Sequence, residues 1–172
     1  LDIQGSLNTS LAISGSDYVL ITNCNIGKNS NWTGIRGDAG NGTDRTSDYV
    51  TISNCIIDSD WDYHYVFYNR ATPYGISVQG MTNGGATHWV IHNNIIKNWW
   101  MNIYVIAAQS TGVSQYHNIS NNEITSTCSF GKAIQISCGG TMGSHAEAYV
   151  NFYNNYVHDI VYGLQISSRN NN

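Results

Sequence analysis

Apolar and polar residues alternate along this chain in one pattern that is repeated five times. The clearest copies are YVLITNCNIG, which starts at residue 18, and YVTISNCIID, which starts at residue 49, and looser copies start at residues 88, 116 and 149. Alternation with a period of two is typical of a β-strand that buries one face. A second apolar phrase follows each copy, for example TGIRG from residue 33. The pattern predicts repeating units of two strands joined by a bend, each unit ending in a variable loop.

Aligning the copies places equivalent residues in columns. Two apolar columns are predicted to face inward: Ile21, Ile52, Ile91, Ile119 and Phe152 form one, and Ile26, Ile57, Ile96, Ile124 and Val157 form the other. An asparagine stands at the bend of every copy, at Asn23, Asn54, Asn93, Asn121 and Asn154. Such units bury their inner faces only when they stack, with equivalent residues ~4.8 Å apart. We therefore expect the five asparagines to form an internal ladder in which each amide bonds to those of the neighbouring coils.

The domain organisation follows from the repeat. We expect one domain over residues 1–172, with coils that start near residues 16, 47, 86, 114 and 147. This length is sufficient for a single core. The sequence does not start with Met and carries no signal-peptide pattern, so we expect it to be part of a longer chain or of an assembly.

The repeated strands and the asparagine column resemble the right-handed parallel β-helix, the fold of pectate lyases, polygalacturonases and many microbial and archaeal surface proteins. The resemblance covers residues 11 to 167. It implies an all-β fold, a right-handed parallel β-helix (solenoid) of about five to six coils with an internal asparagine ladder. Leucine-rich repeats would need a Leu-x-x-Leu-x-Leu frame, which the sequence lacks, and a β-sandwich would not need equivalent asparagines in register.

Composition narrows the classes of function. Only 10% of the residues are charged and the formal net charge is -4, whereas an ordinary domain has ~25% charged residues. The seven Lys and Arg residues are scattered singly, so no basic stripe is available and we expect no nucleic-acid partner. No apolar run approaches ~18 residues, so we expect no membrane span.

Cysteines and glycosylation sequons favour an extracellular or cell-surface location. The cysteine count is four, and the sequons begin at Asn8, Asn31, Asn41 and Asn118; together they are typical of a glycoprotein in an oxidising compartment. Cys24 and Cys55 share a column of adjacent coils, within the separation that a disulfide spans, and Cys128 and Cys138 flank a bend and could pair locally. Alternatively, all four are small buried apolar residues.

Two acidic stretches are candidates for calcium binding. GDAGNGTD contains Asp38, Asn41 and Asp44, and DSDWD contains Asp58, Asp60 and Asp62. Calcium takes six to eight oxygen ligands from flexible loops, and alternating carboxylates supply them. The stretches belong to successive units, so they could lie on one side of the stack. The alternative is two solvated acidic loops without a metal.

Catalytic motifs are weak by comparison. The resemblance to pectate lyases implies an arginine or lysine base near carboxylates that hold calcium, and the best set is Arg70 with Asp58, Asp60 and Asp62; Arg36 is a lone strand residue. The paired-Asp, Gly-His-Gly and Arg-Ile-Lys motifs of polygalacturonases do not occur. The columns predict that His117 faces inward and His92 outward, which leaves no zinc site.

Aromatic residues gather in two stretches, 60–70 and 98–104. Their rings could stack on sugars or pack a loop against the coils. Three functions therefore remain open. The favoured one is a structural module that self-associates through its coil ends or edges into a filament, sheath or surface layer. The alternatives are a polysaccharide lyase or another carbohydrate-active enzyme, and a non-catalytic glycan-binding module.

Overall fold

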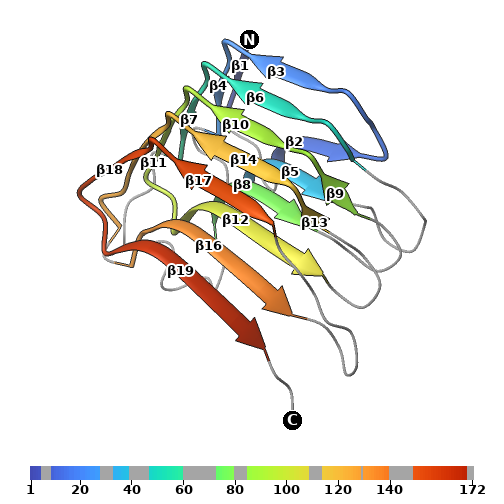
Figure 1. The fold of residues 1–172 in the computed structure, drawn as a ribbon. Coiled ribbons are helices and arrows are strands. Elements are labelled where there is room, and N and C mark those ends of the chain that lie inside the picture. The colour runs from blue at the N-terminus through green and yellow to red at the C-terminus, as the bar shows by residue number, and fades with distance from the viewer. Residues whose placement is uncertain are drawn as a thin grey trace.

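The computed structural model describes residues 1–4, 9–27, 33–38, 47–59, 73–79, 85–108, 114–128, 130–139 and 149–169. These residues are all-β, and no helix occurs among them. Their strands form three large sheets and one short ladder, which wind around a common interior (Figure 1). Every strand pair is parallel.

Each coil contributes one strand to each large sheet, except that the first coil has no strand in sheet C among the described residues. Sheet A consists of β1 (Asp2–Ile3), β4 (Asn25–Ile26), β7 (Ile56–Asp58), β11 (Ile95–Lys97), β15 (Glu123–Thr125) and β18 (Tyr156–Val157). Sheet B consists of β2 (Thr9–Ser14), β5 (Thr33–Asp38), β8 (Tyr74–Gln79), β12 (Met101–Ala108), β16 (Lys132–Gly139) and β19 (Tyr162–Arg169). Sheet C consists of β3 (Leu20–Thr22), β6 (Thr51–Ser53), β10 (Val90–His92), β14 (His117–Ser120) and β17 (Val150–Tyr153). The short ladder pairs β9 (Ala86–Thr87) with β13 (Ser114–Gln115).

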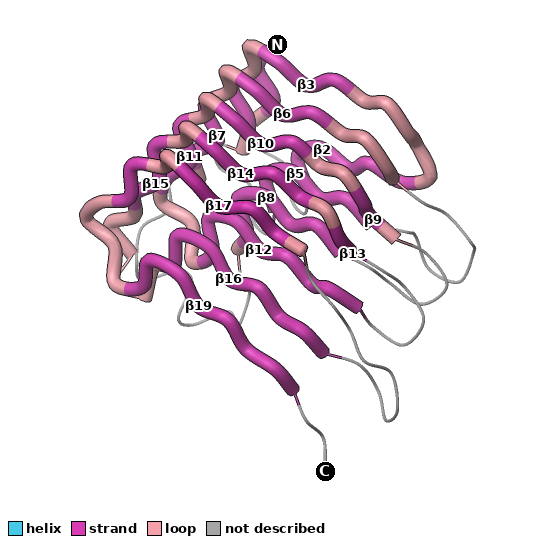
Figure 2. Tube along the Cα trace, in the orientation of Figure 1, coloured by secondary structure: helices cyan, strands magenta, loops and turns pink. Residues whose placement is uncertain are grey.

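The path of the chain is that of a parallel β-solenoid. From β3 in sheet C it passes to β4 in sheet A, to β5 in sheet B, and then to β6, which pairs with β3. Later coils repeat this path, so the layers lie over one another in the order of the sequence (Figure 2). The predicted all-β fold and its parallel stacked strands are therefore confirmed.

Columns of isoleucine fill the interior. Ile52, Ile91 and Ile119 stack in register in sheet C, as predicted, and the column of Ile57, Ile96 and Ile124 stacks in sheet A. A third column lies in sheet B: Ile35, Ile76, Ile103, Ile134 and Leu164. The β-branched side chains suit the pleated inner faces, and all these isoleucines are fully buried.

Two tryptophans fill the space that the isoleucine columns leave. Trp89 is fully buried and its Nε1 donates to the carbonyl of Ser47 at 2.7 Å. Its ring reaches across to sheet B, where it would overlap a Cβ on Gly37. Trp99 likewise donates to the carbonyl of Ile57, and a Cβ on Gly75 would lie 2.9 Å from its ring. Glycine is needed at both positions, because the indole occupies the room of a side chain and a Cβ on Gly75 would also lie 2.5 Å from the carbonyl oxygen of Asn102.

The predicted asparagine ladder lies one residue away from its predicted position. Asn23, Asn54, Asn93, Asn121 and Asn154 are all exposed, and their φ angles lie between 54° and 57°. This left-handed conformation is costly for most residues and is tolerated best by glycine, asparagine and aspartate. The asparagines therefore recur because the backbone of the bend requires them, and the prediction that they point inward is wrong.

The internal ladder is formed by the next column, which comprises Cys24, Cys55, Asn94, Asn122 and Asn155. The Asn122 Oδ1 accepts bonds from the backbone N–H and the side-chain Nδ2 of Asn94, both at 3.0 Å. Asn155 contacts Asn122 in the same way at 3.0 and 2.9 Å. Each Nδ2 also donates to a carbonyl of the preceding coil, Ile52 for Asn94 and Ile91 for Asn122. Buried amides thus satisfy one another from coil to coil.

Candidate functional site

A continuous stack of aromatic rings lies at the corner where the chain enters sheet C. We call it the aromatic column; its members are Tyr18, Tyr49, His88, Tyr116 and Tyr149. Successive ring centroids are 4.9, 4.7, 5.2 and 5.2 Å apart, and the interplanar angles are 3°, 13°, 23° and 6°. The four tyrosines are exposed. Each member is the first residue of a repeat copy, so the sequence carries a signal for this column, although the aromatic sites predicted from it were the stretches at 60–70 and 98–104.

Backbone geometry fixes this corner. Tyr18, Tyr49, His88 and Tyr116 have φ angles between 56° and 60°. The N–H groups of Tyr18 and Tyr49 donate to the carbonyls of Asp48 and Thr87 in the next coil, each at 3.0 Å. In this way backbone hydrogen bonds join neighbouring coils directly at ring-bearing residues. The distance between successive rings is therefore close to the distance between neighbouring strands.

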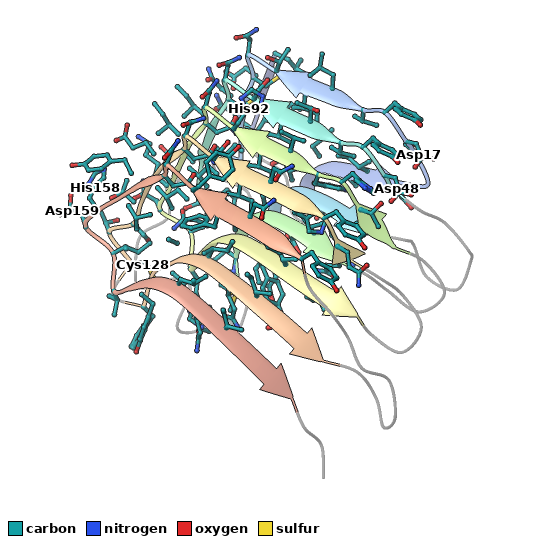
Figure 3. The ribbon with its side chains drawn as sticks, in the orientation of Figure 1. Asp17, Asp48, His92, Cys128, His158 and Asp159 are labelled. Carbon is teal, nitrogen blue, oxygen red and sulfur yellow. The ribbon has the colours of Figure 1, made fainter. Side chains whose placement is uncertain are left out.

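Two carboxylates tie the same corner together. The Asp17 Oδ1 accepts from the backbone N–H of Asp48 at 2.9 Å, and the Asp48 Oδ1 accepts from the N–H and the Oγ1 of Thr87 at 2.8 and 2.7 Å. Figure 3 shows Asp17 and Asp48 at one corner of successive coils. Their oxygens serve as structural acceptors for the backbone.

The stacking limits what the aromatic column can bind. A sugar ring binds to an aromatic residue through a ring face, and here the faces between neighbours are covered by the rings of the column itself. Along its length, the aromatic column exposes ring edges and tyrosine hydroxyl groups to solvent. This geometry argues against glycan stacking along it.

The second feature is the last coil, whose core positions are open. Leu164 and Ile166 continue the inner columns of sheet B, in register with Ile134 and Ile136. Yet 52% of Leu164 and 67% of Ile166 is exposed, against 0% of Ile134 and 8% of Ile136. Tyr162 and Val161 are exposed beside them. Among the strands that the structure describes, this coil thus presents an apolar inner surface and an edge of β19 that pairs with no further strand.

A charged cluster lies where the last coil leaves sheet A. The Nε2 of His158 is 3.3 Å from Glu123 Oε1 and its Nδ1 is 2.8 Å from Asp159 Oδ2. The hydrogen bond to Asp159 and that to Glu123 raise the pKa of His158 above its ordinary value. The Tyr156 ring stacks on the imidazole at 4.5 Å. His158 and Asp159 are at the corner opposite Asp17 and Asp48 (Figure 3).

His117 and His92 lie on the faces that the alternation of the strands predicts for them. As predicted, His117 is fully buried, and His92 lies at intermediate exposure on the outer face. The Nδ1 of His117 accepts from the Trp89 N–H at 3.2 Å. Burial, with a smaller effect from His88, lowers the pKa of His117 to about 3.

The two acidic stretches begin at the ends of strands in different sheets. Asp38 ends β5 in sheet B and Asp58 ends β7 in sheet A; most of both stretches lies outside the described residues, so the expectation of a common side stays a prediction. The Asp58 carboxylate pairs with Lys97 at 3.2 Å and accepts from Asn98 Nδ2 at 2.9 Å. Asn41, Asp44, Asp60, Asp62 and the Asp38 side chain lie outside the described residues. Within the described part of the chain, no group of three His, Cys, Asp or Glu residues is placed to hold a metal.

The cysteines adopt the expected stacking without the expected bridges. Cys24 and Cys55 follow one another in the ladder column, but both are free thiols, as is Cys128. Their Sγ atoms are directed at carbonyls two residues back, Thr22 for Cys24 and Ser53 for Cys55, at 3.2 Å each. The predicted disulfides are therefore wrong for this structure. Burial raises the pKa of the Cys55 thiol; the Cys138 side chain lies outside the described residues.

One sequon of four is described. Asn118 lies in β14 at intermediate exposure, and its Oδ1 accepts from Asn151 Nδ2 at 2.8 Å. Asn8, Asn31 and Asn41 lie outside the described residues. Glycosylation at these four positions stays a prediction.

The candidate lyase residues are mostly outside the described part of the chain as well. Arg70, Asp60 and Asp62 are not described, and Asp58 is paired as above. Arg36 lies in β5 next to Ser77 of β8. The proposed arginine–aspartate set therefore stays a prediction, since Asp58 is its one described member.

Comparisons with protein-family models, with curated proteins and with solved structures find no match. Among the described residues, no helix has the length and apolar character needed to cross a membrane.

Proposed function

We propose that this protein is a structural module of an extracellular or cell-surface assembly, built as a right-handed parallel β-helix that associates end to end with further copies of itself. Parallel strands joined by crossovers are right-handed in ~98% of cases, which supports this hand for the coil. The single observation that carries the proposal is the exposure of the core positions in the last coil.

Within the described residues, the edge strands of the last coil carry few of the sequence features that prevent association. Monomeric sheets protect their edges with lysine, proline, bulges or a covering segment. The segments β17, β18 and β19 contain no lysine or proline, and Arg169 at the end of β19 is their single charged residue. An edge with so few charged residues, next to Leu164 and Ile166, which are exposed among the described residues, favours the addition of another strand layer.

A second copy is the occupant that fits this end. The first strands of the chain, β1 and β2, are the opposite edges of sheets A and B. Leu11 and Ile13 of β2 begin the same columns that Leu164 and Ile166 continue. Head-to-tail contact would place apolar residue over apolar residue at the spacing of the coils. Such heterologous contacts do not close, so they generate filaments.

The proposal is tested by measuring whether the purified protein forms filaments. Electron microscopy and sedimentation of the purified chain are expected to reveal concentration-dependent filaments. Ile166→Lys places a charge on the docking end and is expected to abolish them. Ile56→Lys is the matched control, because Ile56 is also exposed but lies on the outer face of sheet A in the middle of the stack.

Mixing variants distinguishes the possible contacts. Neither Ile166→Lys nor Leu11→Lys alone should assemble, but a mixture should form heterodimers through the two unmodified ends. Dimers of Leu11→Lys alone would indicate contact between two C-terminal ends instead. Monodisperse monomers that release unsaturated product from polygalacturonate or alginate would overturn the structural function in favour of a lyase.

A further inference from the structure

We propose that the aromatic column is a site of oxidative cross-linking, in which neighbouring tyrosines couple to dityrosine and join successive coils covalently. This modification does not depend on assembly, because both partners of each link belong to one molecule. The reactive pairs are Tyr18 with Tyr49 and Tyr116 with Tyr149.

The geometry of both pairs favours coupling. The rings of Tyr18 and Tyr49 are 4.9 Å apart with an interplanar angle of 3°, and those of Tyr116 and Tyr149 are 5.2 Å apart at 6°. All four side chains are exposed, so an oxidant reaches them and the rings can rotate at the surface. Because hydrogen bonds between adjacent coils hold the backbone at each ring, a tyrosyl radical has its partner beside it from the moment it forms.

Within the aromatic column, His88 restricts the links to these two pairs. Its imidazole lies between Tyr49 and Tyr116, at 4.7 and 5.2 Å from them, and it has no phenol to couple. A third stack, Tyr74 with Tyr104 at 4.9 Å, lies on sheet B at intermediate exposure. Coupling there is expected to be slower because the oxidant has less access.

The reaction balances with a peroxide-driven one-electron oxidant, such as a haem peroxidase. Each phenol gives up one electron and its hydroxyl proton to form a tyrosyl radical. Two radicals join through one carbon–carbon bond between the ring positions next to the hydroxyl groups, and the ring protons there move to the oxygens as aromaticity returns. The pair loses two hydrogen atoms, and one hydrogen peroxide accepts the two electrons and two protons to become two waters.

The two links would secure the places where sheet C is weakest. Tyr18 and Tyr49 directly precede the segments that lead into β3 and β6, and Tyr116 and Tyr149 precede β14 and β17. β3 and β17 are the two edge strands of sheet C, and edges open most readily. Each link closes a chain loop of about 30 residues, which restricts the unfolded chain in the manner of a disulfide.

The test is oxidation of the whole chain at high dilution with a haem peroxidase and limiting hydrogen peroxide, followed by proteolysis and mass spectrometry. Two linked peptide pairs are expected, Tyr18 with Tyr49 and Tyr116 with Tyr149, each two hydrogen atoms lighter than its parts. Tyr49→Phe should remove the first link and leave the second, and Tyr149→Phe should do the opposite. Phenylalanine keeps the stacked ring, so the fold is unchanged.

Two further variants sharpen the result. His88→Tyr should add links from the new tyrosine to Tyr49 and to Tyr116, because the position already carries a ring at φ 56°. Tyr153 and Tyr162 are the internal controls, since their exposures of 50% and 49% equal that of Tyr149, also 49%, while neither stacks on a tyrosine among the described residues. Links at Tyr153 or Tyr162 as frequent as those in the column, or the same pattern from urea-unfolded protein, would overturn the proposal.

Discussion

Ile134 and Leu164 occupy the same column one coil apart, and the contrast between them separates what a coil provides for itself from what its neighbour provides. Ile134 is covered by coils on both sides, through Ile103 and Leu164. In the part of the chain that the structure describes, Leu164 has a coil on one side alone, and half of its surface is accessible. The two residues have similar chemistry and equivalent backbone positions. Burial in a solenoid therefore depends on the next coil more than on the residue.

The amide ladder repeats the contrast. Asn122 is buried and bonds in both directions, to Asn94 on one side and to Asn155 on the other. In the preceding coil, Asn155 bonds to Asn122 and to the carbonyl of Ile119. Its Nδ2 also donates to the carbonyl of Tyr153 in its own coil. The ladder residue of the last coil thus keeps its bonds to the preceding coil and, among the described residues, makes none to a following coil.

The largest expected difference in the free energy of unfolding is between truncation of Ile134 and truncation of Leu164. Ile134→Ala should lower the free energy of unfolding by about 4 kcal/mol, because it removes buried methyl groups and leaves a cavity. Leu164→Ala should cost about 1 kcal/mol or less in the dilute monomer, because that side chain is half exposed. Chemical denaturation with urea measures both values. Equal costs in dilute solution would mean that the last coil is already covered.

A smaller effect is expected in the ladder. Asn122→Ala should cost about 3 kcal/mol, since buried donors and acceptors of Asn94 and Ile91 lose their partner, whereas Asn155→Ala should cost about 1 kcal/mol. The control is Asn121→Gly, at the exposed bend next to it. Glycine accepts the left-handed conformation, so this variant should be close to neutral. A cost at Asn121 as large as that at Asn122 would place the ladder in the column that the sequence predicts.

The smallest effect concerns two histidines with opposite pKa shifts. The pKa of His117 in the folded protein is about 3, below its ordinary value of 6.5, so its contribution to stability is complete above pH 6.5 and is lost as the pH falls towards 3. Between pH 6.5 and pH 5 the loss should be about 2 kcal/mol. His117→Val introduces the residue that Val150 supplies at the paired position of β17, and it should remove this slope in urea denaturation curves recorded against pH.

His158 at the last coil should show the opposite sign. Its raised pKa means that its contribution is complete below pH 6.5 and is lost as the pH rises through the folded-state value. NMR titration of both imidazoles checks the directions, and Glu123→Gln should lower the pKa of His158 while that of His117 stays unchanged. Identical titration of the two rings would contradict the contrast between an inner coil and the last one.

Much of the fold was predictable from periodicity, and most of the surface features were not. Ile52, Ile91 and Ile119 were assigned to one inward column because a period of two leaves no other face for them. The aromatic column was present in the sequence as the first letter of each repeat, yet alternation alone does not say that a residue at a bend stacks on its equivalents. The free thiols of Cys24 and Cys55 could not be predicted either, because sharing a column brings two residues close without deciding where each Sγ points.

The sequence by itself determined that the strands repeat, that they alternate, and that equivalent residues stack, because the apolar period and the spacing of the copies depend on the local chain alone. Only the tertiary structure decided which asparagine of each adjacent pair is buried, as at Asn121 and Asn122. Both residues are asparagine, so composition cannot separate them. The backbone of the bend turns the first into the left-handed conformation and outward, and the same turn carries the second into the interior, where the neighbouring coils complete its hydrogen bonds.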